Sequence, residues 1–242
     1  MPSFWENLKV DGQDMRMYAS VPRGSGPFPA VVVIHPANGV EQFVQSICDR
    51  LSGEGYAAVA PDLFHRITDD MLADGSGRTE HLSDPDIIAD VNATVDFLRN
   101  HSAIDGERLG ITGFCMGGRV AWLMAAANKY FKAAVPYYGG NIMVPRGNAT
   151  ESPFDRTKEI NCPIMFHFGA IDKNPSPEDM AKLDAELKKF GKPHQFFSYP
   201  DADHAFMDHT GQRYNQAGAD TSWLRTLESF ATHLKRIPVR RK

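Results

Sequence analysis

Cys115 lies between glycines in the stretch GITGFCMGGRVA, residues 110–121, where an apolar run ends and a helix-like segment begins. The pattern Gly-x-Cys-x-Gly, formed with Gly113 and Gly117, is typical of a sharp strand-to-helix turn that exposes a nucleophile. A helix N-terminus beside the sulfur favours the thiolate and lowers the pKa of the thiol. A small, inert core cysteine is the alternative interpretation. The strand-turn-helix context favours the nucleophile, which would need a base, an acid and oxyanion donors.

An acid and a histidine follow Cys115 in the order that enzymes built on this turn use, each after a later strand. Asp172 comes after the apolar run at 163–169, and His204 comes after the run at 194–200. Asp172 is predicted to orient the imidazole of His204 and to stabilise its charged form. His204 is predicted to exchange a proton with Cys115 or with an attacking water.

Other residues compete for these roles. His167 lies inside an apolar run, where a core histidine is the commoner outcome, and His209 is a weaker rival to His204. Asp201 and Asp203 belong to the same tight loop as His204, so they reach its ring less easily than Asp172 does.

The loop after the last apolar run also contains a group of potential hard-metal ligands: Asp201, Asp203, His204, Asp208 and His209. Their spacing matches no common metal-binding pattern. We expect the reaction to need neither a metal nor a cofactor, because side chains and backbone N–H groups can supply the nucleophile, the base, the acid and the oxyanion donors of acyl transfer.

Acyl chemistry needs N–H donors aimed at the developing oxyanion. One is predicted to be the backbone N–H of Met116, the residue after the nucleophile. The other is expected from the loop after the apolar run at 30–35, where Pro36 has no N–H and Ala37 is the first residue able to donate.

Short β-branched runs alternate with helix-like segments from residue 29 onward. This alternation predicts a mostly parallel sheet with helices on both faces, an α/β fold. Strands are expected at 30–35, 56–61, 108–113, 132–138, 163–169 and 194–200, and helices at about 42–54, 86–101, 116–129, 176–190 and 213–236. The opening segment predicts an antiparallel pair at the sheet edge, joined through Asp11 and Gly12. No repeat or linker divides the chain, so residues 1–242 are interpreted as one domain.

The composition is that of an ordinary globular protein, with 242 residues, 42% of them hydrophobic, and a formal net charge of −4. Basic residues gather only in the tail at 240–242, so we expect no nucleic-acid partner. No signal-peptide core and no apolar run of about 20 residues is present, so we expect no membrane association and a cytoplasmic location. Three cysteines, an odd number without C-x-x-C spacing, fit reduced thiols.

Together these motifs resemble the dienelactone hydrolase family, the carboxymethylenebutenolidase-type members of the α/β-hydrolase fold. The resemblance covers nearly the whole chain through VVVIHPANGV, GYAAVAPDLFHR, GFCMGG, PYYGG, HFGAID and YPDADHAF. It implies a Cys115–Asp172–His204 triad that hydrolyses a small ester or lactone through a thioester, without a cofactor. A thioesterase or transacylase on the same triad, and a non-catalytic small-molecule-binding protein, are the alternatives, and the chain is expected to be a monomer or homodimer.

Two positions depart from the family pattern. The glutamate that family members carry in the first loop, where it helps to form the thiolate, is replaced by Pro36. The arginine that binds the substrate carboxylate after the histidine is absent, and Phe206 and Asp208 occupy this stretch. We therefore expect a preference for a neutral ester or lactone, unless Arg66 or Arg78 points into the pocket.

Overall fold

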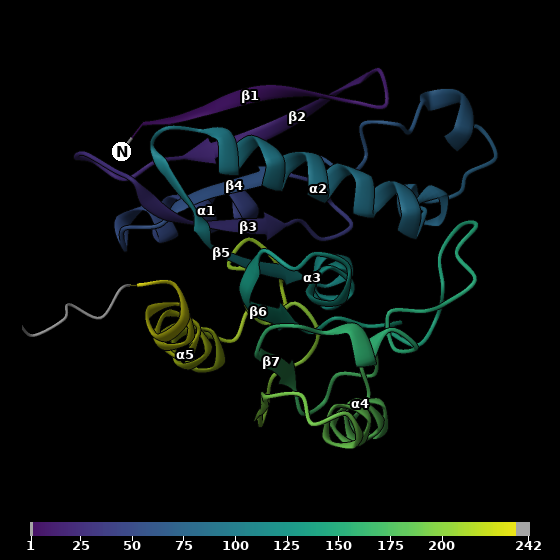
Figure 1. Ribbon diagram of the computed structural model, residues 1–242. Helices are drawn as coiled ribbons and strands as arrows, with labels where there is room; N and C mark the ends of the chain where they lie inside the picture. Colours follow the sequence, from purple (N-terminus) through teal and green to yellow (C-terminus); the bar gives the residue numbers. More distant parts are fainter. Residues whose placement is uncertain (1, 236–242) are drawn as a thin grey trace, which may run out of the picture.

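The protein is described by a computed structural model that covers residues 2–235. Eight strands form one sheet in the order β1-β2-β4-β3-β5-β6-β7-β8 (Figure 1). The strands are β1 (Ser3–Val10), β2 (Gln13–Ser20), β3 (Phe28–Ile34), β4 (Ala57–Pro61), β5 (Ile104–Phe114), β6 (Phe131–Tyr137), β7 (Ile164–Gly169) and β8 (His194–Tyr199). The six runs predicted as strands all form strands. The basic tail at 240–242, and the last residue of the helix predicted to end at 236, lie outside the described residues.

Five α-helices connect or follow these strands, close to the predicted ranges. They are α1 (Gln42–Gly53), α2 (Asp84–Asn100), α3 (Met116–Ala127), α4 (Pro177–Lys189) and α5 (Gln216–Leu234). Three short 3-10 helices, η1 (Asp69–Leu72), η2 (Arg78–His81) and η3 (Thr157–Glu159), lie in the connecting segments. Within the described residues, none of the helices is long and apolar enough to cross a bilayer.

The sheet is parallel from β4 to β8, and its N-terminal edge is antiparallel. β1 and β2 form a hairpin whose turn places Asp11 and Gly12 at φ values of 50° and 80°, the left-handed region that a tight hairpin turn requires. β2 then pairs antiparallel with β4, while β3 pairs parallel with both β4 and β5. The prediction of an antiparallel edge on a mostly parallel sheet is confirmed.

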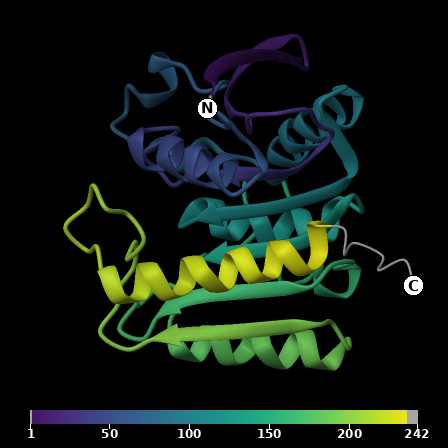
Figure 2. The ribbon, with the colours of Figure 1, turned by 90° about the vertical axis from the view of Figure 1, so that its left-hand side faces the viewer.

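Two helical layers cover the two faces of the sheet. Side chains of α2, α3 and α4 pack in one buried cluster, and those of α1 and α5 pack in the other. Alternation along β3 explains the division, since Val32 and Ile34 point into the first cluster and Val31 and Val33 into the second. Figure 2 shows α5 lying across one face of the strands. All eight strands belong to one sheet, which supports our proposal that the chain forms one domain.

The parallel strands bring three separate segments to one edge of the sheet. Cys115 follows β5, Asp172 lies three residues after the end of β7, and His204 lies in the loop after β8. Because parallel strands end on the same side, their following loops gather at the carboxyl edge, where open α/β sheets bind ligands.

Candidate active site

Cys115 occupies a strained turn between β5 and α3. Its backbone has φ 57° and ψ −119°, a conformation that side-chain-bearing residues rarely adopt. The turn is held by a hydrogen bond from the Cys115 N–H to the Tyr137 carbonyl (3.1 Å) and by one from the Gly118 N–H to the Cys115 carbonyl (2.9 Å). The sulfur is therefore held at the start of α3, as the sequence pattern predicts.

The glycines around Cys115 permit close backbone packing. A Cβ atom on Gly113 would lie 2.0 Å from the Gly117 carbonyl oxygen, and one on Gly117 would lie 2.3 Å from the Ile34 carbonyl oxygen. A Cβ on Gly118 would lie 2.4 Å from the Tyr137 carbonyl oxygen. Any side chain at these positions would push α3 away from the sheet, so the glycines are required by contact as well as by the turn.

Asp172 is the carboxylate that bonds the His204 ring. Its Oδ2 lies 2.9 Å from His204 Nδ1, and its Oδ1 accepts a hydrogen bond of 2.8 Å from the Asn174 N–H. The Asp172 side chain is buried, whereas the rival Asp203 accepts a bond of 2.7 Å from the His204 backbone N–H. Because Nδ1 is engaged by Asp172, the other ring nitrogen is left for the Cys115 sulfur, to which His204 is hydrogen-bonded.

The two backbone N–H groups predicted as oxyanion donors both act on the Cys115 sulfur. Hydrogen bonds from the Met116 and Ala37 N–H groups lower the pKa of the thiol, in addition to the bond and charge of His204. The N–H donors from the first loop and from α3 thus both act on the sulfur of Cys115.

The electrostatics favour an ion pair between Cys115 and His204. Burial alone would raise the pKa of the Cys115 thiol, but His204 and the backbone donors outweigh this effect and lower it. Burial works in the opposite direction on His204, and its hydrogen bonds with Asp172 and Cys115 outweigh it and raise its pKa well above the ordinary value. These opposite shifts favour a thiolate beside an imidazolium.

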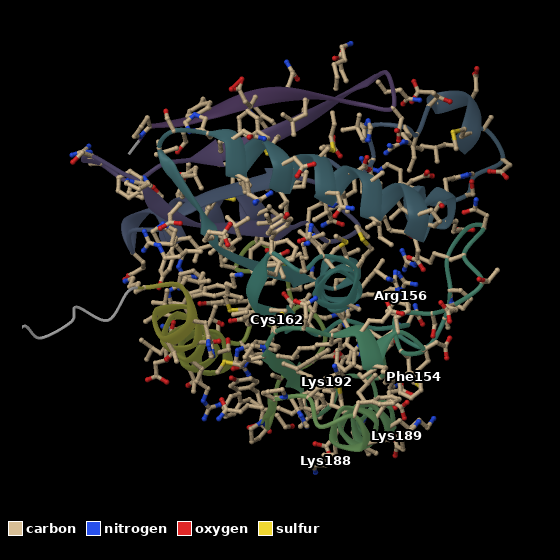
Figure 3. All side chains as sticks on the ribbon, in the orientation of Figure 1. Phe154, Arg156, Cys162, Lys188, Lys189 and Lys192 are labelled. Carbon is tan, nitrogen blue, oxygen red and sulfur yellow. The ribbon has the colours of Figure 1, made fainter. Side chains whose placement is uncertain are left out.

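The other two cysteines lie in surroundings that keep the thiol protonated. Burial raises the pKa of Cys162 to about 12 and raises that of Cys48 still further. Both side chains are buried in the core, and Figure 3 shows Cys162 among the packed side chains of the molecule. Cys115 is the cysteine whose surroundings lower the pKa.

His35 fixes the loop that carries the Ala37 donor, a role that the sequence analysis did not assign. Its Nδ1 lies 2.7 Å from the Pro36 carbonyl oxygen, and its Nε2 accepts a hydrogen bond of 3.0 Å from the Leu63 N–H. Burial lowers the pKa of His35, which keeps the ring neutral and able to accept that bond. In the sequence, the only sign of this role was the position of His35 at the end of the apolar run at 30–35.

Arg78 lies over the same loop. Its guanidinium donates to the Asn38 carbonyl oxygen (3.1 Å) and stacks over the Phe64 ring, 4.6 Å from the centroid. The structure thus places this predicted substrate-binding residue beside the oxyanion donors, where it is exposed.

Phe206 is buried in the core, which corrects its expected role in substrate binding, whereas the expected role of Arg66 stays a prediction. Arg66 forms ion pairs with Asp90 and, at 2.8 Å, with Asp11 of the hairpin turn, so two carboxylates already neutralise its charge. Phe206 is 0% exposed and packs against the tyrosines Tyr137, Tyr138 and Tyr199. The sequence showed the position of both residues in a loop but not which way the loop turns them.

Asp208 is half-buried and accepts hydrogen bonds from the Thr210 N–H (2.9 Å) and hydroxyl (2.6 Å). His209, the rival base, is exposed and stands with its ring near Phe43. Within residues 2–235 no three or more His, Cys, Asp or Glu side chains are grouped in a way that could hold a metal ion.

Arg146 is a cation near the site that the sequence analysis missed. Its Nη1 is buried without a hydrogen-bond partner among the described residues. The nearby Asp84 is already bound by both nitrogens of the Arg119 guanidinium (2.6 and 2.9 Å). Burial and the charge of Arg119 lower the pKa of Arg146, whereas Asp84 and Cys115 oppose this effect. Arg119 and Arg146 thus share one carboxylate, that of Asp84, and the charge of Arg146 also acts on Cys115.

A cleft of about 370 Å³ lies beside His204 and Asp172. It is lined by Ile171, Asp172, Lys173, Asn174, Asp203, His204 and Arg213. A larger hollow of about 570 Å³ lies where β7 and β8 begin, so it is at the opposite edge of the sheet from Cys115. We place the candidate site beside the smaller cleft, since Asp172 and His204 line it.

The fold and this constellation of side chains define a hydrolase of the α/β-hydrolase fold. Residues 15–234 match the model of the dienelactone hydrolase family, and the chain belongs to that family. The protein is 35% identical, over 93% of its length and 84% of the relative's, to an Escherichia coli (strain K12) protein named "Putative carboxymethylenebutenolidase".

Two further similarities concern a lactonase and a solved structure. The chain is 29% identical over 95% of its length, and 94% of the relative's, to a Bradyrhizobium protein named "Probable 2-oxo-3-(5-oxofuran-2-ylidene)propanoate lactonase". The crystal structure of "Putative Dienelactone Hydrolase" from Klebsiella pneumoniae superposes with a TM-score of 0.88 at 29% identity. That alignment covers 96% of this chain and 99% of the other.

Proposed function

We propose that the protein hydrolyses a small ester or lactone by nucleophilic catalysis, with Cys115 as nucleophile, His204 as proton carrier and Asp172 as its orienting acid. The observation that carries this proposal is the convergence on one sulfur atom of the His204 ring and two backbone N–H groups. The family membership supports the reaction class, and the opposite pKa shifts of Cys115 and His204 support the ionised nucleophile.

In the first half-reaction the Cys115 thiolate attacks the carbonyl carbon of the substrate, and a C–S bond forms. The negative charge that develops on the carbonyl oxygen is stabilised by the N–H groups of Met116 and Ala37. Collapse of the tetrahedral intermediate breaks the ester C–O bond. The leaving oxygen takes the proton of the His204 imidazolium, and a thioester of Cys115 remains.

The second half-reaction reverses these roles with water as the nucleophile. Neutral His204 removes a proton from the water as its oxygen attacks the thioester carbon, and the same N–H groups stabilise the new oxyanion. The C–S bond then breaks, which releases a carboxylic acid and restores the thiolate beside the imidazolium. Asp172 holds the ring in the required orientation throughout.

The charge of the substrate depends on two residues with opposite signs. Asp208 was the basis for expecting a neutral substrate, but its carboxylate already accepts two hydrogen bonds from Thr210. Arg146, by contrast, has a buried Nη1 that finds no hydrogen-bond partner in the part of the chain that the structure describes. We therefore revise that expectation and propose that a lactone bearing a carboxylate is accepted, with Arg146 as its counter-charge. The name of the Bradyrhizobium relative, a lactonase for a propanoate, is consistent with this revision.

The nucleophile is tested with purified protein and a panel of aryl esters, lactones and thioesters. Cys115→Ala should abolish hydrolysis with an unchanged melting temperature, and Cys115→Ser should retain little activity. The matched controls, Cys48→Ala and Cys162→Ala, should keep their turnover. Full activity in Cys115→Ala would refute the mechanism. If the protein hydrolyses only the thioesters of the panel, the alternative function as a thioesterase is favoured.

The charge is tested by comparing kcat/KM for a carboxylate-bearing lactone and for an uncharged lactone of similar size. Arg146→Met should lower the ratio of the two values, and Asp208→Asn should raise it. Each change is expected to be about tenfold, the effect of roughly 1.4 kcal/mol. An unchanged ratio in Arg146→Met would remove this residue from the binding of the substrate.

A further inference from the structure

Tyr138 carries a buried hydroxyl that the mechanism above does not use. The side chain is 1% exposed, and its hydroxyl has no acceptor for its proton within residues 2–235. A buried hydroxyl without a partner destabilises a folded protein, so its retention calls for an explanation. Tyr138 directly follows β6, whose last residue pairs with Phe114, the neighbour of the nucleophile.

The backbone of Tyr138 is also strained. Its φ of 37° lies in the left-handed region, which is unusual for a bulky residue. The conformation is held by a short hydrogen bond from the Tyr138 N–H to the His167 carbonyl oxygen (2.7 Å). Strain of this kind persists where the surrounding structure enforces it, and it is concentrated at functional sites.

This conformation packs the Tyr138 ring against the reacting groups. The ring centroid lies 5.2 Å from that of His204 and 5.3 Å from that of Phe206, the core residue that supports it from the other side. The charged groups that act on the phenol are Cys115 and Asp208, together with the Tyr137 hydroxyl, and the Met207 N–H is close to its oxygen. Burial raises the pKa of the phenol, and these negative charges add to the effect, so Tyr138 keeps its proton.

The Cys115 sulfur needs a further donor when substrate binds. In the free protein its charge is stabilised by the N–H groups of Met116 and Ala37 as well as by His204. When substrate binds, its carbonyl oxygen takes the same two N–H groups. Until the C–S bond forms, the thiolate has then lost two of its donors, and Pro36 of the first loop has no N–H to replace them.

We propose that Tyr138 is a further hydrogen-bond donor of the active site, whose hydroxyl donates to the ionised sulfur of Cys115. The inference rests on the proposed function of Cys115 as the nucleophile. The hydrogen bond forms by rotation of a side chain, and no covalent bond is made or broken in this step. The phenol proton, which has no acceptor among the described residues, gains one whenever the sulfur is ionised, in the free protein as well as with substrate bound.

The test is Tyr138→Phe, with Tyr56→Phe as a matched control. Tyr56 is 1% exposed, and its hydroxyl also lacks a partner among the described residues. It lies just before β4, at the edge of the sheet opposite Cys115, so the same atom is removed from an equally buried ring far from the chemistry. The first readout is the pH dependence of Cys115 alkylation by iodoacetamide, which needs no substrate.

In Tyr138→Phe the alkylation profile should move to higher pH, while Tyr56→Phe should follow the wild type. Ester turnover should fall about tenfold to a hundredfold in kcat for Tyr138→Phe, the range of one hydrogen bond to a charged group. The melting temperature should stay unchanged or rise, since the lost hydroxyl has no partner.

An alkylation profile of Tyr138→Phe that matches those of the wild type and Tyr56→Phe would overturn the proposal. So would a loss of activity with an unshifted profile and a lower melting temperature, which would indicate a structural role. If the wild type hydrolyses no ester, the proposed function fails, and the alkylation profile still decides whether Tyr138 acts on the sulfur.

Discussion

Two histidines of the C-terminal half, His204 and His167, have opposite surroundings. His204 lies at the carboxyl edge of the sheet between a carboxylate and a thiol, which raise its pKa despite burial. His167 lies within β7, where the Tyr199 hydroxyl is 2.8 Å from Nδ1 and the Thr226 hydroxyl is 3.2 Å from Nε2. Burial and the charge of Arg225 lower its pKa to about 3. The charge of the partners, and not burial by itself, decides which histidine can carry a proton.

The same comparison predicts opposite effects of pH on stability. The folded pKa of His204 is raised, so its contribution is present below the ordinary value of 6.5 and is lost as the pH rises through the folded value. The folded pKa of His167 is lowered, so the unfolded chain binds more protons between about 3 and 6.5, and stability is lost as the pH falls. One histidine is suited to exchange protons and the other to stay neutral in the core.

The largest expected difference comes from replacing each histidine in turn. His204→Gln should lower kcat/KM by roughly 10⁴-fold or more, because the base of comparable triads contributes at least this much. His167→Gln should change activity little but destabilise the fold by about 1–3 kcal/mol, since it disturbs two buried hydroxyl partners. Ester hydrolysis and denaturant unfolding of both variants check this. Equal losses of activity in the two variants would contradict the assignment of His204 as the proton carrier and His167 as a core residue.

The carboxylate beside His204 is expected to have the next largest effect. Asp172→Asn preserves the shape of the side chain but removes the charge that holds the imidazolium, so turnover should fall roughly 10⁴-fold. Asp203→Asn is the matched control, because Asp203 bonds only the backbone of His204, at 2.7 Å. Steady-state kinetics on one aryl ester measures both. Similar losses in the two variants would contradict the assignment of Asp172 as the orienting acid.

The effect expected on the alkylation rate of Cys115 is smaller, but it reports on the thiol directly. In the wild type, iodoacetamide should alkylate Cys115 at a pH below the ordinary thiol pKa of 9, because His204 and the N–H donors lower it. In His204→Gln the effect of burial prevails, so the rate near neutral pH should fall about tenfold or more. Cys115→Ala is the control for labelling of the two buried cysteines. A wild-type profile centred at or above 9 would argue against the ion pair.

The smallest effect concerns His167 in acid. Between pH 6 and 4 the wild type should lose stability faster than His167→Gln, by up to about 1.4 kcal/mol per pH unit for one proton. Urea unfolding of both proteins at several pH values measures the two slopes. If the unfolding free energies of the two proteins fall with the same slope, His167 takes up a proton in the folded state. The surroundings of His167 would then be more like those of His204 than its two hydroxyl partners indicate.

Most of the fold could be predicted from the sequence because its signals are local. β-branched runs such as 30–35 are buried on both faces, and their alternation with amphipathic segments predicts parallel strands separated by helices. The candidate nucleophile, acid and base were predictable for a related reason. Each follows the end of a strand, and parallel strands bring their carboxyl ends to one edge.

The direction of loop side chains could not be predicted in the same way. Phe206 and Asp208 are two residues apart in one loop, yet one packs in an aromatic core and the other is half-buried near the phenol of Tyr138. Arg66 lies in a segment that was expected to overhang the pocket, and there it forms an ion pair with Asp90 of α2, which the sequence did not reveal. A loop has no repeating period, so the sequence carries no sign of which side each residue faces.

The sequence by itself determined which groups are candidates for the chemistry, since Cys115, Asp172 and His204 follow the ends of β5, β7 and β8 in the order that the proposed triad needs. The tertiary structure decided which neighbours act on them. Nη1 of Arg146 and the hydroxyl proton of Tyr138 acquire their significance from lacking partners among the described residues, and a missing partner is a property of three-dimensional packing. The physical reason is that desolvation and charge depend on distances between segments far apart in the chain, which no local pattern records.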